Sequence, residues 1–290
     1  MNIVVLCGGL STERDVSIKS GTLIFNALKE RGHNVVLIDS FFGYEGTYEN
    51  PKDVFEKETV SFSSVIGDSE PDLDAVKASR NQKNGSKLGD NVIDICREAD
   101  IVFMAMHGED GENGKIQALF DVEGIKYTGS GYLGSAIAMN KGLSKILFKA
   151  AGVGTADSIT VYKDDKSHRN VGFPCVVKPC SGGSSVGVSI VNSEAEYEAA
   201  LALSFKYEDA VIVEKYIKGR ELTIGILDGE PMPIIEIIPK QGFYDYKNKY
   251  QAGLTEEICP AQISPVLKER IEKAAVKAYK ALMIDTYCRI

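Results

Sequence analysis

A lysine followed by a loop rich in glycine and serine is the part of this sequence best suited to bind a phosphate. Lys178 closes an apolar stretch and is followed by PCSGGSSVG, residues 179–187. Glycine lets the backbone approach a ligand closely, and successive backbone N–H groups can form a nest for an anion. Lys141 is a second isolated basic residue upstream. These residues predict a phosphate site, although the loop taken alone would fit an ordinary hairpin equally well.

A second group of charged residues follows a later apolar stretch. The segment AVIVEKYIKGRE, residues 210–221, ends a buried strand with Glu214 and Lys215 and places Glu221 seven residues after Glu214. A glutamate at such a strand end can accept a hydrogen bond from an adenine amine, and Glu221 could hold ribose hydroxyls. A single lysine or glutamate is usually a solvated surface charge. Their coincidence at strand ends around one glycine-rich loop favours a nucleotide site.

Other nucleotide-binding patterns are absent or incomplete. The sequence has no GxxxxGK[ST], which excludes a P-loop, and it has neither HRD nor DFG, which excludes a protein kinase. Residues 129–134, GSGYLG, form a literal GxGxxG between a strand and a helix. Because no acidic residue closes the following strand, this pattern disfavours a nicotinamide or flavin site.

The elements that must position these residues fall into two kinds. Short apolar strands alternate with helical spacing in the first part of the chain, with strands at 3–7, 35–38, 101–106 and 125–128 and helices at 16–28, 91–98 and 115–122. Such alternation predicts a doubly wound α/β unit, a parallel sheet with helices on both faces. Residues 43–90 are polar and rich in helix and strand breakers, which predicts an elaborated surface segment rather than core.

The second part of the chain has a different texture. A helix carrying Lys141 is predicted at 131–151, and strands then follow closely at 158–162, 174–178, 186–191, 210–217 and 221–238, with helices at 194–203 and 268–283. Asp228-Gly229 between two apolar runs predicts a β-hairpin. Antiparallel strands with helices packed on one side make this part α+β.

Composition narrows the class of protein. The 290 residues carry a net charge of −8, with 44% hydrophobic and 26% charged residues, which is typical of a globular protein. The acidic balance argues against nucleic acid as a partner. The six cysteines show no metal-ligand spacing and fit a reducing compartment, and no apolar stretch is long enough to span a bilayer. We predict a cytoplasmic protein that acts on small molecules and has no membrane partner.

Seven motifs occur together in the order seen in D-alanine–D-alanine ligases of the ATP-grasp superfamily: STERDVS, MHGEDGENG, YTGSG, MNKGLSK, VVKPCSGGSSVG, EKYIKGRE and FYDYKNKY. The chain resembles that family from residue 3 to its end, apart from 43–90. The resemblance implies three domains: an α/β N-terminal domain, 1–129, and two α+β ATP-grasp domains, 130–213 with the phosphate lid and 214–290, the last incomplete. It also implies ATP-dependent ligation of two D-alanines through an acyl phosphate, which supplies peptidoglycan precursors.

The resemblance assigns a role to each candidate residue. Lys141 and Lys178 would hold the ATP phosphates under the lid loop, residues 181–187. The other ATP contacts would be Ser185 in the lid, Glu214, Lys215 and Ile217 at adenine, and Glu221 at the ribose. The catalytic set would comprise Glu13 for the first substrate's ammonium, Ser184 and Tyr250 bonded with it, Lys249 near the transferred phosphate, His107 near the first substrate, and Arg289 at the oxyanion.

The sequence departs from the family at two places. The lid loop has Ser181 and Gly182 where the family often has a charged pair, which would alter the mobility of the loop. The family's Mg²⁺ ligands, an aspartate just past Arg289 and a Glu-x-Asn, have no counterpart up to Ile290. Because Mg²⁺ neutralises the phosphates in this chemistry, we expect the 290-residue chain to be an inactive fragment of an active enzyme.

Two alternative functions stay open at this point. The chain could belong to an ATP-grasp ligase for another amino acid pair, or it could be a non-catalytic nucleotide-binding fragment. Tyr250 together with Lys249 fits an amine as the second substrate. A homodimer formed through the N-terminal domain would be usual for the family.

Overall fold

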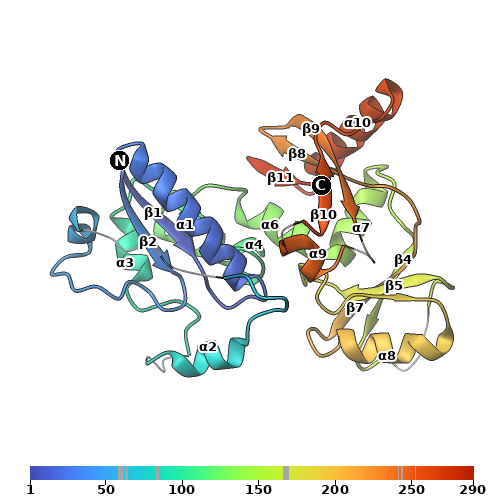
Figure 1. Cartoon of the computed structure of the whole chain (residues 1–290), viewed down its shortest axis with the longest axis horizontal. Coiled ribbons are helices and arrows are strands. Elements are labelled where there is room, and N and C mark those ends of the chain that lie inside the picture. The colour runs from blue at the N-terminus through green and yellow to red at the C-terminus, as the bar shows by residue number, and fades with distance from the viewer. Residues whose placement is uncertain are drawn as a thin grey trace. The chain divides into compact units, whose positions relative to one another are not determined.

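The computed structural model describes residues 1–57, 62, 65–81, 85–165, 170–240, 242, 244–251 and 253–290. These residues form two compact units, Met1–Tyr132 and Leu133–Ile290. Figure 1 shows the parallel sheet of the first unit and the two antiparallel sheets of the second. Phe243 of the FYDYKNKY motif and parts of 43–90 lie outside the described residues.

A parallel sheet with helices on both faces forms the first unit, as the sequence predicted. Its strands are β1 (Asn2–Cys7), β2 (Asn34–Asp39) and β3 (Ile101–Met104), and their order is β2-β1-β3. Its helices are α1 (Arg14–Glu30), η1 (Pro51–Glu56), α2 (Leu73–Ser79), α3 (Val92–Arg97), α4 (Glu109–Glu112) and α5 (Lys115–Glu123). Alternate strand residues point to opposite faces, so Val4 packs with α3 and α5 while Val5 packs with Phe25 of α1.

Two expectations about the first unit need correction. The strand predicted at 125–128 is reduced to one bridge, in which Tyr127 pairs with Val102 of β3. The segment 43–90 is not confined to the surface, because Val54 and Phe55 of η1 are buried in the core that includes Val4. Burial of these two apolar side chains is enough to anchor an otherwise polar segment to the core.

The second unit holds two four-stranded antiparallel sheets. The first has the order β4-β7-β5-β6, with β4 (Ser158–Tyr162), β5 (Cys175–Pro179), β6 (Ser189–Val191) and β7 (Ala210–Lys215). The second has the order β10-β9-β8-β11, with β8 (Glu221–Leu227), β9 (Glu230–Pro239), β10 (Thr255–Ile258) and β11 (Tyr287–Arg289). The antiparallel arrangement agrees with the prediction, although the predicted boundary at residues 213 and 214 falls within β7 and the three-domain division stays a prediction.

Helices cover these sheets and connect them. They are α6 (Tyr132–Met139), α7 (Lys141–Ala150), α8 (Glu194–Ser204), α9 (Tyr246–Tyr250) and α10 (Pro265–Ala281). Tyr197 of α8 is buried against β5 and β7, and Tyr279 of α10 packs on β8 and β9. Figure 1 shows α8 beside β5 and β7, and α10 beside β8 and β9. Within the described part of the chain, no helix combines the length and the apolar character that crossing a bilayer would require.

Local side-chain chemistry explains two details of the second unit. The single helix predicted at 131–151 is two helices, because the Asn140 side chain accepts a hydrogen bond from Leu143 N at 3.0 Å and so begins α7. The predicted hairpin between β8 and β9 turns at Asp228 and Gly229, whose φ angles of 49° and 83° are both positive. Asp-Gly is the pair best able to adopt such a turn.

Candidate active site

Lys178 and Glu214 lie on the same face of the first antiparallel sheet. Lys178 of β5 is opposite Ile212 of β7, and Glu214 is two residues further along β7, so period-two alternation directs both side chains to one face. The opposite face is covered by α8. The N-terminus of α7 approaches the charged face, where a Cβ on Gly142 would lie 3.2 Å from Thr160 Oγ1 of β4.

Three lysines surround this face. Lys178 Nζ donates to Glu214 Oε1, and Lys145 Nζ lies 2.9 Å from Glu214 Oε2. Lys141 Nζ donates to the carbonyl oxygens of Cys180 and Gly182 at the start of the lid loop. Sequence reasoning missed Lys145, although its spacing of four residues from Lys141 indicates that both lie on one side of a helix.

The electrostatics of this cluster follow from burial and from the neighbouring charges. Burial lowers the pKa of Lys141 to about 8, and the charge of Lys178 adds to this effect, while Cys180, Glu208 and Glu214 oppose it. Burial alone would raise the pKa of Glu214, but the charge and hydrogen bond of Lys178, together with Lys145, bring it below its ordinary value. Glu214 is therefore ionised at neutral pH. Because Lys178 and Lys145 share this one carboxylate, the group carries a net positive charge.

The lid loop is held by hydrogen bonds at several points within the second unit. Ser184 Oγ lies 2.6 Å from Tyr250 Oη, and Ser185 Oγ donates to Tyr244 O at 2.8 Å. Ser181 N donates to Glu208 Oε2 at 2.6 Å. Ser184 and Ser185 have φ angles of 48° and 60°, a conformation that non-glycine residues adopt only when their surroundings hold it. The Ser184–Tyr250 contact joins two residues that the resemblance pairs.

Tyr250 belongs to α9, a short helix that follows the second sheet's β9. Asp245 caps α9 by accepting a hydrogen bond from Asn248 N at 2.9 Å. The rings of Tyr246 and Tyr250 pack edge to face with centroids 4.9 Å apart, and this packing fixes the direction of the Tyr250 hydroxyl.

Charged candidates gather around Tyr244, which precedes α9. Lys249 Nζ lies 5.2 Å from the centroid of the Tyr244 ring. Burial raises the pKa of Tyr244, and so do the charges of Glu257 and Glu221, whereas the charge of Arg289 lowers it. Glu221 and Arg289 are thus within electrostatic range of the same phenol.

The two remaining candidate ATP contacts, Lys215 and Ile217, are solvent-exposed. Both are exposed at the end of β7, and Ile217 is 69% exposed. An apolar side chain this exposed takes no part in the hydrophobic core.

The first unit brings together Glu13 and His107, the two predicted residues of the first substrate. Ser11 Oγ accepts from Glu13 N at 3.2 Å and donates to His107 O at 2.6 Å. Gly108 has a φ of 67°, which L side chains rarely adopt, and a Cβ there would lie 2.7 Å from Glu13 Oε2, so glycine is favoured beside this carboxylate. His107 Nε2 lies 3.1 Å from Ser20 Oγ. Burial lowers the pKa of His107 despite the opposing charge of Glu13, which favours a neutral imidazole at pH 7.

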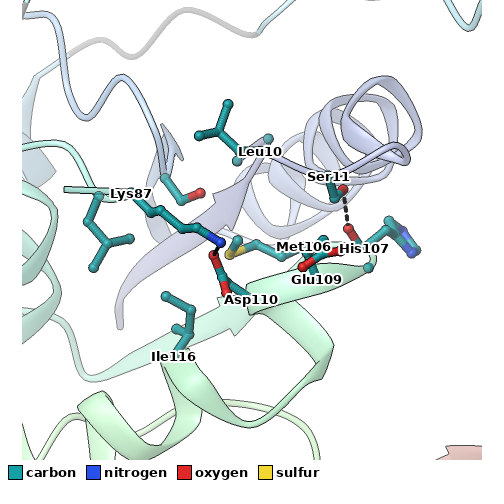
Figure 2. Close-up of a pocket in the computed structure, with 13 residues that line it drawn as sticks. Leu10, Ser11, Lys87, Met106, His107, Glu109, Asp110 and Ile116 are labelled. Carbon is teal, nitrogen blue, oxygen red and sulfur yellow. Dashed lines mark hydrogen bonds and ion pairs between the residues drawn. The ribbon is translucent and has the colours of Figure 1, made fainter. Parts of the chain in front are cut away.

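A pocket lies beside these residues, and Lys87 of the segment 43–90 lines it together with His107 (Figure 2). Lys87 Nζ lies 2.7 Å from Asp110 Oδ2, and Lys115 Nζ lies 3.2 Å from Asp110 Oδ1. Burial would raise the pKa of Asp110, but both lysines bring it below its ordinary value. The segment expected to be a surface elaboration therefore contributes a charged residue to this pocket.

A buried ion pair supports the start of α1, and sequence reasoning did not identify it. The Arg14 guanidinium donates to the Asp39 carboxylate and, at 2.6 Å, to Gly9 O. Asp39 also accepts from Phe41 N at 2.9 Å. A Cβ on Gly8 would lie 2.3 Å from Asp39 Oδ2. The pair thus joins the end of β2 to the turn after β1. Because Arg14 directly follows Glu13, the pair also holds the chain next to that candidate residue.

The described residues include no group of three or more histidine, cysteine, aspartate or glutamate side chains placed to hold a metal ion. Glu214, the most buried carboxylate of the lysine cluster, is already paired with Lys178 and Lys145. The residues described do not fit a protein-held Mg²⁺.

A parallel α/β unit followed by two antiparallel sheets, with lysines beside a glycine-serine loop, is the arrangement of the ATP-grasp class of ligases. The family model described as D-ala D-ala ligase N-terminus matches residues 2–130, and the model described as D-ala D-ala ligase C-terminus matches residues 147–290. The chain belongs to the D-alanine–D-alanine ligase family.

Individual relatives agree with this assignment. The chain is 41% identical over 294 residues to the D-alanine–D-alanine ligase of Pediococcus pentosaceus, covering 100% of this chain and 84% of the relative. The D-alanine–D-alanine ligase of Bacillus anthracis complexed with ATP has a TM-score of 0.70 at 31% identity, over 100% of this chain and 80% of that one. The VanG D-Ala:D-Ser ligase of Enterococcus faecalis also has a TM-score of 0.70, at 28% identity, over 99% and 84% of the two chains.

Proposed function

We propose that this chain carries out the ATP-dependent joining of two D-alanines to D-alanyl-D-alanine, a precursor of peptidoglycan. The observation that carries the proposal is the cluster of Lys141, Lys178 and Glu214 beside the lid loop, in a chain whose relatives are D-alanine–D-alanine ligases. A net positive cluster beneath a loop of backbone amides is suited to a triphosphate.

In this proposal ATP is held mainly by the second unit. Lys141 and Lys178 bind the phosphates, and the amides of 181–187 with Ser185 cover them. At the base and sugar, the contacts come from Glu214, Lys215, Ile217 and Glu221. The exposed end of β7 supports this arrangement, because Lys215 and Ile217 are exposed there.

The reaction begins by activating a poor electrophile. The carboxylate of the first D-alanine does not react with an amine at neutral pH, so one of its oxygens first attacks the γ-phosphorus of ATP. A new O–P bond forms, the bond to the bridging oxygen breaks, and ADP leaves. Positioning and charge neutralisation supply most of the catalysis of this step, and Lys249 is the residue that we assign to the transferred phosphoryl group.

The second step forms the peptide bond. The amine of the second D-alanine attacks the acyl phosphate, the tetrahedral oxyanion collapses, inorganic phosphate leaves and the nitrogen loses a proton. Arg289 is assigned to the oxyanion, where a fixed positive charge is most effective. Glu13 is assigned to the ammonium of the first D-alanine with His107 nearby, and Ser184 with Tyr250 is assigned to the closed state of the lid.

The direct test is an ADP-release assay on the purified chain with ATP, Mg²⁺ and D-alanine, followed by mass identification of the product. D-Alanyl-D-alanine formation is the outcome that the proposed function predicts, and it would contradict the prediction from sequence that the 290-residue chain is inactive. ATP binding without ADP release would instead support a non-catalytic nucleotide-binding role. It is also the result expected if the 290-residue chain is inactive.

A ligase for another amino acid pair is the second candidate, and the similarity to a D-Ala:D-Ser ligase favours it. Offering D-serine in competition with D-alanine separates the two, because the mixed dipeptide would dominate for a D-Ala:D-Ser enzyme. The use of ATP favours the cytoplasm as the site of action. A homodimer stays a prediction, which sedimentation velocity would test.

A further inference from the structure

Lys145 of α7 contacts the proposed nucleotide site and has no role in the reaction described above. Its Nζ lies 2.9 Å from Glu214 Oε2 and donates to Thr155 Oγ1 at 2.7 Å and to Ala156 O at 2.9 Å. The side chain is only 12% exposed. Three acceptors therefore hold this ammonium in place, two of them in the turn that leads from α7 into β4.

Glu214 is shared between two lysines, one at each oxygen. Lys178 Nζ donates to Oε1, while Lys145 faces Oε2. One carboxylate compensates one ammonium, so one positive charge remains uncompensated among the three groups. Their side chains are mostly buried, where charges are screened less than in water.

Without Lys145 the same site would have less net positive charge to attract an anion. Glu214 would then pair with Lys178 alone, and such a pair has little net charge. For Lys178 to turn toward a phosphate, it would have to leave a buried carboxylate without a compensating charge, which is strongly unfavourable. With Lys145 present, Glu214 keeps a partner when Lys178 moves.

We propose that Lys145 is a positioning residue that holds Glu214 and thereby leaves the charge of Lys178 available to the phosphates of a nucleotide. It acts through Glu214 and does not touch the substrate. This inference rests on the proposed function, because it takes Lys178 as a phosphate ligand. It concerns a residue that the family resemblance did not assign.

The experiment compares binding of ATP and of adenosine to the full chain by calorimetry, without turnover. Adenosine has no phosphate, so Lys145→Met should lower the affinity for ATP by about tenfold and leave the affinity for adenosine unchanged. Lys145→Arg should restore most of the ATP affinity, because a guanidinium keeps the charge and can pair with the carboxylate. Lys149→Met is the matched control, since Lys149 is an exposed lysine one turn later on α7. This variant should bind ATP as tightly as the unmodified chain does.

Equal losses for ATP and adenosine would overturn the inference, because they would mean that Lys145 shapes the adenine pocket. An unchanged ATP affinity would overturn it as well. If Lys145→Met does not fold, Glu214→Gln decides the matter: removing the carboxylate frees Lys178, so the ratio of ATP to adenosine affinity must rise, and a constant or lower ratio contradicts the inference. An unmodified chain that binds no ATP would contradict the proposed function itself.

Discussion

In the proposed function, individual side chains of the second unit divide between nucleotide binding and lid closure. Lys178 faces the charged cluster, while Tyr250 contacts Ser184 of the lid at 2.6 Å. Lys178→Ala should therefore weaken ATP binding and slow phosphoryl transfer. Tyr250→Phe removes one hydrogen bond, typically worth about 1 kcal/mol, so it should raise the KM for the second D-alanine several-fold and leave ATP affinity nearly intact.

Steady-state kinetics with each substrate varied in turn measure this division of roles. Tyr162→Phe is the control for Tyr250→Phe, because Tyr162 is an exposed tyrosine at the end of β4. If Lys178→Ala and Tyr250→Phe changed the same kinetic constants in the same proportion, the two roles would not be separate.

The pH dependence of ATP binding should report on Lys141. Its pKa is lowered to about 8, first by burial and then by Lys178, against the opposing charges of Cys180, Glu208 and Glu214. The ammonium binds phosphate only when protonated, so ATP affinity should be constant near pH 7 and fall as the pH rises through about 8. Calorimetric titrations across this range measure the effect, and Lys141→Met should bind ATP weakly with a flat profile. A wild-type profile that stays flat to pH 9.5 would contradict the assignment.

The same group affects the stability of the free protein in the opposite direction. The folded pKa of Lys141 lies below its ordinary value of 10.5, so the unfolded chain binds more protons between these two values. Stability from this group therefore rises with pH across that window and is lowest below pH 8. The buried ammonium of Lys141 next to Lys178 thus lowers the stability of the free protein at neutral pH. A bound phosphate would offset this loss by its negative charge.

Among the elements, α6 depends on one glycine for its packing. A Cβ on Gly134 would lie 2.6 Å from Met283 O and 3.2 Å from Ile284 Cα, both in the turn after α10. The last glycine of the literal GxGxxG is thus explained by close packing of a helix against backbone. Gly134→Ala should lower the free energy of unfolding by roughly 1–3 kcal/mol, as measured by urea denaturation.

Gly154→Ala is the matched control for that substitution. A Cβ on Gly154 would meet nothing within 4 Å, and its φ is not positive. This change should be neutral or slightly stabilising, because it restricts the unfolded chain. Equal destabilisation by both substitutions would argue against the packing explanation.

The segment 43–90 should influence the first-substrate residues through Lys87. Arg80 is buried and donates to Ser86 O and Leu88 O, both at 2.7 Å, which fixes the residue between them. Lys87 then pairs with Asp110, three residues after His107 (Figure 2). Lys87→Met should raise the KM for the first D-alanine several-fold without changing ATP affinity. Because Lys115 also contacts Asp110, the effect should be smaller than that of Asp110→Asn.

Kinetics at saturating ATP separate this effect from a general loss of stability. Lys77→Met is the control, since Lys77 forms an exposed pair with Asp74 in the same segment, and such pairs contribute little. A rise in KM for Lys77→Met as large as that for Lys87→Met would contradict a specific role of Lys87.

At the scale of the whole molecule, each unit has its own hydrophobic core. The first unit contains the clusters around Val4 and Val5, and the second contains those around Tyr197 and Tyr279. A ligand held by one unit stabilises chiefly that unit. ATP alone should slow amide exchange in the lid loop and at 244–250, and leave 108–112 unchanged. Hydrogen exchange with mass spectrometry measures this, and equal protection of 108–112 by ATP alone would contradict nucleotide binding by the second unit.

The sequence by itself determined the features that depend on neighbours in the chain. Alternating apolar strands and helices predicted the parallel sheet of the first unit, and Asp228-Gly229 predicted the hairpin between β8 and β9. The order of the motifs indicated the ligase family, which the comparisons confirmed. The strand, helix and turn signals are local, because helix period, strand period and turn geometry are set within a few residues.

Only the tertiary structure decided which charged groups meet. The bond between Lys178 and Glu214 spans 36 positions and that between Arg14 and Asp39 spans 25, and Lys145 joins the first of these from a separate helix. Sequence shows the type and charge of such residues but not their partners, since many pairings of lysines with carboxylates satisfy the same pattern. Strand register and helix packing select one of them, and burial then gives the selected pair its strength.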